Sequence, residues 1–442
     1  MRTTANSTNE LILLIKALVI VAATALAMAV TAQEPIEPAE LTVELAVDAA
    51  ERDNPGLAEM RSRYRAMAEI PSQVGTLPDP VLSLGALNLP LDTFNRDQEA
   101  MTQMQIGFSQ VFPFPGKLGL REEAAGFEAQ AAYFSVDEMR LQLINRVVNK
   151  WWQVYYLDRA IDTIDSNHLL LEQFIKIART KYEIGTGLQQ DVLLAQLELS
   201  KLIDQAIQVE SLRRNQVIRL NVLMDRAPQS VVLLPESVSV VLPEILAEDE
   251  LYRLAEVARP LLKNLEQTVE AANSRLDLAR RDYYPDFSVG VTYGNRAGRN
   301  APFVGGSRSD FLSFMVGVKI PLYIGRKQSR AVSQRSSEVQ KQRYALRDEK
   351  NQVKADISSA VTDYRRAQAQ LSLFEDGIVP QARQTVQSML AGYQVSEVDF
   401  LNLVRSQVTL FNYELQYWKA LTEAKQALSW LQASVGEESI YE

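Results

Sequence analysis

The stretch VFPFPGK at residues 111–117 returns in altered form as KIPLYIGR at residues 319–326, and this repetition decides the fold. It belongs to a series of landmarks that recur in the same order in both halves of the chain, about 205 to 211 residues apart. The other landmarks are segments 54–57 and 259–262, with proline as the second residue, the Pro-Asp segments 77–80 and 284–287, and segments 182–196 and 393–407, which begin with tyrosine. Internal repeats determine architecture before any local pattern does. The sequence therefore predicts two structural repeats, residues 33–248 and residues 249–442.

Between the second and third landmarks of each repeat, apolar residues alternate with polar or small ones. In the second repeat, Phe287, Val289, Val291 and Tyr293 alternate with Ser, Gly and Thr. A period of two is typical of strands with one apolar face. The prediction is a hairpin at about residues 80–112 and another at about residues 286–321, with strands near 80–90, 101–112, 286–294 and 311–321. The first of these strands has the least clear pattern.

Most of the remaining sequence predicts long helices. Residues 116–181 contain no proline, and at 1.5 Å per residue a helix of this length would span about 100 Å. Residues 325–393 are similar apart from Gly377 and Pro380. Apolar residues alternate between spacings of three and four within residues 116–181, and again from Leu188 to Val209. This spacing indicates coiled-coil-like packing between neighbouring helices.

The composition indicates an exported protein. Residues 1–32 combine an apolar run with the small-residue exit Val30-Thr31-Ala32, which predicts a cleaved signal peptide; an uncleaved anchor is the alternative. The net charge of −9 argues against a nucleic-acid partner, and the absence of cysteine excludes both disulfides and a lipid-bearing cysteine. No other stretch approaches 18 apolar residues, so entry into a membrane would require a closed sheet.

Four strands cannot close a barrel, because small barrels need about eight strands to reach a workable diameter. Other copies of the chain would have to complete the sheet, and a trimer would supply twelve strands. The polar strand faces, rich in Ser, Thr, Gln and Gly, suit a water-filled interior. The expected fold class is therefore mainly α with a four-stranded β contribution, in which a trimeric 12-strand β-barrel continues into a long α-helical barrel.

This duplicated plan resembles the TolC family of outer membrane efflux proteins over essentially the whole mature chain. Segments 77–80 and 110–118 look most like its heavy-metal branch, the CzcC and CusC type, and the Tyr-x-x-Gly-x5-Asp pattern at residues 182–191 resembles the family's periplasmic tip. The resemblance implies a homotrimer in the cell outer membrane, in contact with its lipid, with a long periplasmic extension. It implies passive conduction of substrate expelled by an inner-membrane pump through a periplasmic adaptor protein. The cargo stays open between metal ions, small organic compounds and polypeptides.

The resemblance also assigns roles at the two helix tips. A periplasmic gate is expected from Asp191 with Tyr393, and a weaker one from the duplicate positions Tyr182 and Asn402. The alternative is that Asp191 caps its helix. Adaptor contact is expected from the turn residues Gly185, Thr186, Gly187, Leu188, Ser396, Glu397 and Val398; the alternative is that they merely reverse the helices. The second tip departs from the family at Ser396, where Gly is usual, and at Asn402, where Asp is common.

No catalytic residue, metal site or cofactor is expected. His168, the single histidine, lies between Ile164 and Leu171, and we expect it to be a packed polar break in the helical seam. One histidine and no cysteine offer no convergent ligand set, and the scattered methionines are ordinary core filler, with a soft copper site as the alternative. Two other classes of protein fit the sequence less well. A periplasmic coiled-coil scaffold without a pore leaves the alternating strands unexplained, and a hydrolytic enzyme lacks its residue constellation.

Overall fold

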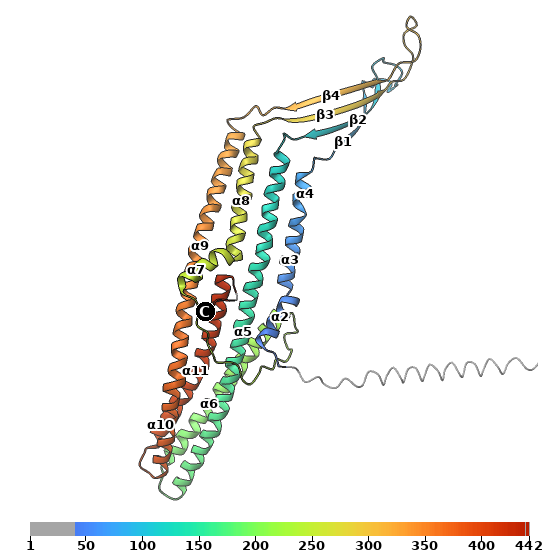
Figure 1. Cartoon of the computed structure of the whole chain (residues 1–442). Coiled ribbons are helices and arrows are strands. Elements are labelled where there is room, and N and C mark those ends of the chain that lie inside the picture. Colours follow the sequence, from blue (N-terminus) through green and yellow to red (C-terminus); the bar gives the residue numbers. More distant parts are fainter. Residues whose placement is uncertain (1–39, 438, 442) are drawn as a thin grey trace, which may run out of the picture.

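The computed structural model describes residues 40–437 and 439–441, and the expected signal peptide lies outside them. The chain forms a long helical rod with a small sheet projecting from one end (Figure 1). In chain order the elements are α2 (Val43–Asp53), α3 (Pro55–Ala68), α4 (Ile70–Gly75), β1 (Val81–Leu87), β2 (Gln103–Phe112), α5 (Lys117–Glu183), α6 (Gln189–Leu223), α7 (Glu248–Ala258), α8 (Pro260–Arg281), β3 (Asp286–Asn295), β4 (Phe311–Lys319), α9 (Gln328–Leu373), the π-helical turn η1 (Phe374–Ile378), α10 (Val379–Gln394) and α11 (Phe400–Val435).

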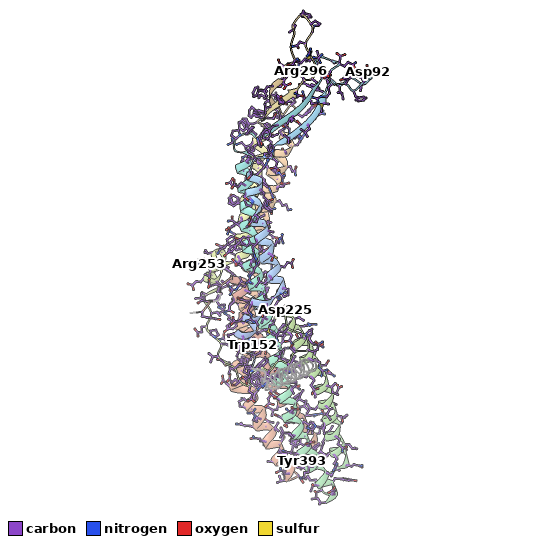
Figure 2. The ribbon with its side chains drawn as sticks, turned by 90° about the vertical axis from the view of Figure 1, so that its right-hand side faces the viewer. Asp92, Trp152, Asp225, Arg253, Arg296 and Tyr393 are labelled. Atoms are coloured by element: carbon purple, nitrogen blue, oxygen red, sulfur yellow. The ribbon has the colours of Figure 1, made fainter. Side chains whose placement is uncertain are left out.

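The four predicted strands form one antiparallel sheet in the order β1-β2-β3-β4. The register places residues of the same kind side by side. Leu84 lies opposite Ile106, which lies opposite Tyr293, which in turn lies opposite Leu312. Because neighbouring residues of a strand point to opposite faces, this register gives the sheet one apolar face and one face of mostly Ser, Thr, Gln and Gly. The loops at the far end of the sheet, which carry the labelled Asp92 and Arg296, lie at the opposite end of the molecule from Tyr393 (Figure 2).

The helices form columns along the rod (Figure 1). The longest, α5, has 67 residues and runs from the sheet to the far end, about 100 Å at 1.5 Å per residue. The second long column is interrupted by η1. Pro380 follows this turn, and proline has no N–H and its ring would clash with the carbonyl four residues before it. The N–H of Val379 instead reaches the carbonyl of Phe374, five residues back, so the column continues through a π-turn.

The polar residue that packs between Ile164 and Leu171 of α5 lies one position before the expected one. Asn167, between Ile164 and Leu171, is 3% exposed, and it is the polar residue packed in the seam. His168 is only half-buried, with its Nδ1 4.0 Å from Glu172 Oε1, so its expected position was wrong. A spacing of three or four leaves two adjacent positions almost equally able to face inward, which explains the error.

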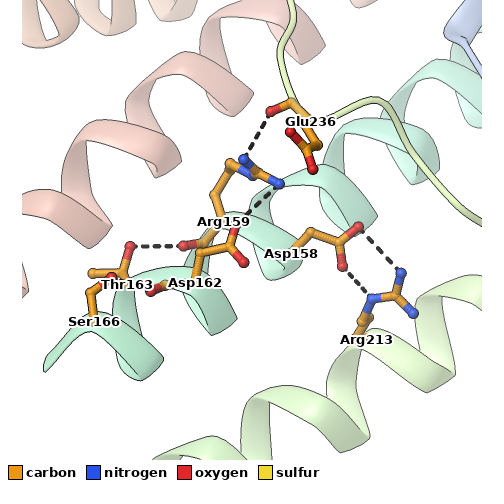
Figure 3. Close-up of polar contacts among 7 residues, drawn as sticks. All are labelled: Asp158, Arg159, Asp162, Thr163, Ser166, Arg213 and Glu236. Atoms are coloured by element: carbon orange, nitrogen blue, oxygen red, sulfur yellow. Dashed lines mark hydrogen bonds and ion pairs between the residues drawn. The ribbon is translucent and has the colours of Figure 1, made fainter. Parts of the chain in front are cut away.

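At mid-length, the segment 224–247 wraps across the columns and is fastened by charged groups of α5. Arg159 donates through Nη1 to the carbonyl of Glu236 at 2.8 Å, and its Nη2 lies 3.0 Å from Asp162 Oδ2 (Figure 3). Beside it, Asp158 pairs with Arg213 of α6. These links hold an otherwise irregular segment against the rod.

Within the described residues, no helix combines enough length with enough apolar character to cross a membrane.

Candidate functional site at the helix tips

Two helix hairpins, α5 with α6 and α10 with α11, turn at the end of the rod farthest from the sheet (Figure 1). Their turns lie at residues 184–188 and 395–399. The tips therefore collect the gate and adaptor residues named from the sequence, although these residues lie about two hundred positions apart in the chain.

The first turn depends on two glycines. Gly185 has a φ of 77°, a left-handed conformation that glycine adopts without steric cost. The backbone N–H groups of Thr186 and Gly187 both donate to the carbonyl of Lys181 at 2.9 Å, which closes the end of α5. A Cβ at Gly187 would lie 2.8 Å from Lys181 Cβ, so a side chain has no room there.

The second turn has the same shape with a different residue. Ser396 adopts a φ of 64°, matching Gly185 in its left-handed conformation. Its N–H donates to the carbonyl of Tyr393 at 3.1 Å, as the N–H of Gly185 does to Tyr182 at 3.0 Å. A left-handed residue other than glycine costs about 1 to 2 kcal/mol. Ser396 therefore makes the same turn as Gly185 with added backbone strain.

The expected gate pair meets within one chain. The hydroxyl of Tyr393 donates to Asp191 Oδ2 at 3.3 Å. Tyr393 is 5% exposed, and burial together with the nearby Asp191 carboxylate raises its pKa to about 12. Asp191 lies in the first turn of α6, whose N-cap residue is Leu188 and has no side-chain capping bond. Asp191 is therefore not the cap, and its charge favours the helix through the positive end of the helix dipole.

Lys181, which was not among the expected tip residues, binds the two hairpins together through more contacts than the gate pair. Lys181 Nζ donates to the carbonyls of Tyr393 at 2.6 Å and Gln394 at 3.2 Å, and to Ser396 Oγ at 2.9 Å. It also lies 4.8 Å from the centre of the Tyr393 ring. Its amino group thus satisfies carbonyls at the C-terminus of α10, where a positive charge is favourable. One signal for Lys181 is present in the sequence: the two repeats differ at this position, because the matching residue of the second repeat is Gly392.

The second gate pair does not meet within the chain. Tyr182 and Asn402 are both exposed, and they form no hydrogen bond with each other in the described part of the structure. Among the expected adaptor residues, Gly185, Thr186, Leu188, Ser396 and Glu397 are exposed, whereas Gly187 and Val398 are half-buried.

Sequence reasoning also missed a matched pair of exposed apolar residues at the turns. Ile184 is 68% exposed and Val395 is 69% exposed, and they occupy equivalent positions in the two tips. Water-exposed apolar side chains at the end of a rod are suited to contact with another protein. Among the described residues, no group of three or more His, Asp or Glu side chains could hold a metal ion.

Residues 251–437 match the family model described as outer membrane efflux protein, so most of the second repeat carries the sequence signature of that family. No curated protein matches the chain in sequence.

Solved structures give the fold of nearly the whole chain. The outer membrane protein VceC of Vibrio cholerae is 18% identical with a TM-score of 0.73, covering 89% of this chain and 96% of its own. The outer membrane channel MtrE of Neisseria gonorrhoeae, in its open state, is 14% identical with a TM-score of 0.74, covering 90% and 89%. CusC, described in connection with transmembrane channel formation, is 14% identical with a TM-score of 0.75, covering 90% and 93%. At these identities the likeness establishes the fold.

Proposed function

We propose that this protein is the outer-membrane duct subunit of a tripartite efflux system. In this proposal three copies form a tube that passively conducts substrate expelled by an inner-membrane pump through a periplasmic adaptor. The observation that carries the proposal is the sheet at one end of the rod, which has an exposed apolar face and two unpaired edge strands. Support also comes from the family match over residues 251–437 and from the shared fold.

The sheet is incomplete as a single chain. β1 pairs only with β2, and β4 pairs only with β3, so each leaves one edge of backbone groups unpaired. Long open edges invite further pairing, and in a hydrocarbon layer each unpaired group would cost several kcal/mol. Since four is an even number, β4 of one copy would meet β1 of the next in the antiparallel sense used throughout the sheet. Three copies would close a barrel of twelve strands.

The helical region also has surface suited to neighbouring copies. On α6, Leu193, Leu197 and Ile207 are all more than half exposed, although this helix packs its other side against α5. A stripe of apolar residues on the outer side of an already packed helix marks a contact surface. This stripe favours a multi-helix tube over a scaffold that works as a single chain.

The tips would form the gate and the docking surface. Three copies of the Tyr393–Asp191 link, each reinforced by Lys181, would bias the pump-facing end toward a closed state. The adaptor would contact the turns, with Ile184 and Val395 as apolar anchors. Cargo selection would belong to the pump, and heavy-metal cations are the class favoured by the resemblance of segments 77–80 and 110–118.

Separating the cell envelope into its membranes and the soluble periplasm tests the proposal. The protein should sediment with outer-membrane markers and stay there after a salt wash. Recovery in the soluble periplasm would refute the proposal and favour the coiled-coil scaffold.

Cross-linking tests the docking surface separately. A cysteine at Thr186 or Glu397 should cross-link to the adaptor, with Glu236→Cys at mid-length as the matched control. Cross-linking from Glu236→Cys alone would contradict tip docking.

A further inference from the structure

The junction between the sheet and the helices holds a buried charge cluster that joins the two repeats within one chain. Lys117 begins α5, and its side chain is 4% exposed. Its Nζ donates to the carbonyl of Tyr284 at 3.0 Å and to Asp286 Oδ1 at 2.9 Å, and it lies 3.3 Å from Asp282 Oδ1. Asp286 Oδ1 also accepts from the N–H of Phe114 at 3.0 Å. The end of strand β2 is thereby fastened to the start of strand β3.

The equivalent residues at the outer edges of the sheet carry the same charges. Arg326 follows β4 as Lys117 follows β2, and Asp79 precedes β1 as Asp286 starts β3. The backbone confirms the equivalence of the two cations: the N–H of Lys117 donates to the carbonyl of Phe114 at 3.0 Å, and the N–H of Arg326 donates to the carbonyl of Tyr323 at 3.1 Å.

These outer residues are exposed, and their side chains form no hydrogen bond or ion pair within residues 40–437 and 439–441. Arg326 and Asp79 lie beyond opposite edges of the sheet, so they cannot reach one another in one chain.

An aromatic contact repeats the pattern. Beside the inner cluster, Phe114 stacks on Tyr284 with ring centres 4.5 Å apart and planes 15° apart. The matching positions at the outer edges are Tyr323, which is 74% exposed, and Leu77, which is 42% exposed. Each outer edge thus carries one member of an ion pair and one member of an apolar contact. The matching members lie at the opposite edge of the same chain, out of reach.

We infer that Arg326 of one copy binds Asp79 of the next, with Tyr323 packed on Leu77 of that neighbour, so that the contact between copies repeats the Lys117–Asp286 junction within each chain. The inference rests on the proposed function, since it needs copies arranged edge to edge. It adds the residues that bring β4 of one copy to β1 of the next and that set the register of the two strands.

Strand register gives an independent check. Within the chain, Phe112 lies opposite Phe287. Residues 319–326 contain one residue more than residues 111–117, so the strands are aligned through Pro113 and Pro321, and the extra residue falls after Pro321. In this alignment Ile320 matches Phe112 and Pro80 matches Phe287. The equivalent arrangement between copies then places Val318 opposite Leu82 and Val316 opposite Leu84 of the neighbour. All four residues lie on the apolar face, so this face continues unbroken across the contact. A slip of one residue would set Val318 against Ser83 and break it.

The test exploits the absence of cysteine from the natural sequence. Two differently tagged full-length copies are expressed together, one with Asp79→Cys and the other with Arg326→Cys, and whole membranes are treated with a short bis-maleimide. A denaturing gel should show a dimer that carries both tags. The control replaces Arg326→Cys with Arg281→Cys, an exposed position beside Pro115 at the inner junction, and should give no such dimer.

A charge exchange provides the second measurement. Arg326→Asp alone should reduce the fraction of oligomer that survives mild detergent heating by roughly tenfold, the change expected when one partner of a specific charge pair is reversed. Arg326→Asp combined with Asp79→Arg should restore it.

The outcomes separate this inference from the proposed function. A doubly tagged dimer together with charge rescue supports the pairing. A trimer by native mass without either result overturns the pairing and leaves the duct intact. A protein that is monomeric by native mass overturns both.

Discussion

Replacing Lys181 with methionine removes the charge that joins the two helix tips while keeping a side chain of similar length. Three hydrogen bonds would be lost, to the carbonyls of Tyr393 and Gln394 and to Ser396 Oγ. The substitution would also leave helix-terminal carbonyls without a donor. We expect the tips to open locally more often, because this lysine is buried and water cannot replace it at once.

The magnitude follows from the contacts. Hydrogen bonds to a charged group contribute about 1.5 to 3 kcal/mol each, and bonds that share one donor are not additive, so Lys181→Met should cost about 2 to 4 kcal/mol. Tyr393→Phe removes one bond of 3.3 Å, longer than an ordinary O–H···O bond. Its cost should be about 0.5 to 1.5 kcal/mol. Lysine, rather than the tyrosine–aspartate pair, should therefore dominate the stability of the closed tips.

Hydrogen exchange at the amides of Ser396 and Glu397 measures this directly, since both are hydrogen-bonded in the second turn. Lys181→Met should speed exchange by roughly 30- to 900-fold, and Tyr393→Phe by about 2- to 12-fold, at 1.36 kcal/mol per factor of ten. Lys176→Met, on the exposed face of α5, is the control and should leave the rates unchanged. A larger effect from Tyr393→Phe than from Lys181→Met would refute this ranking.

Three further outcomes are expected. The folded-state pKa of Tyr393 is raised from 10.0 to about 12, so the stability that its hydroxyl contributes to the tips is complete below pH 10 and is lost as the pH rises toward 12. Over that range, hydrogen exchange at the tip amides should accelerate more in the natural protein than in Tyr393→Phe. Gly185→Ala should lower the free energy of unfolding by about 1 kcal/mol, because Gly185 has a positive φ. Gly119 lies inside a helix with open space at its Cβ position, so Gly119→Ala should raise the free energy of unfolding by about 0.5 to 1 kcal/mol. Denaturant titration measures both changes. Phe314→Arg on the apolar sheet face should destabilise the membrane-inserted form by about 2 to 4 kcal/mol, and Ser313→Arg on the other face should leave the yield of inserted protein unchanged.

The sequence predicted the parts of the fold that follow from periodicity. A strand was expected near residues 101–112 and occurs at Gln103–Phe112, and a helix expected over residues 116–181 occurs at Lys117–Glu183. Even the weakest strand formed, at Val81–Leu87, because it pairs along its whole length with β2. Long, strongly patterned segments allow little ambiguity about the type of element.

Other features have no local signature. The partners of Lys181 are backbone carbonyls and a hydroxyl, the nearest in sequence 212 residues away. Every residue has a backbone carbonyl, so the sequence does not mark which ones will bind a lysine. The packed position of Asn167 in place of His168 depends on a rotation of the helix that a spacing of three or four does not fix. The pairing of Asp191 with Tyr393 came from the family resemblance at matched positions and not from a local pattern, and the structure brings the two side chains within hydrogen-bond distance.

The most direct test of the central claim is the native mass of the protein extracted from outer membranes in mild detergent. The account predicts a particle of three chains, since one chain leaves two sheet edges unpaired and three chains close twelve strands. A stable single chain, at concentrations where detergent does not strip native oligomers, would contradict it.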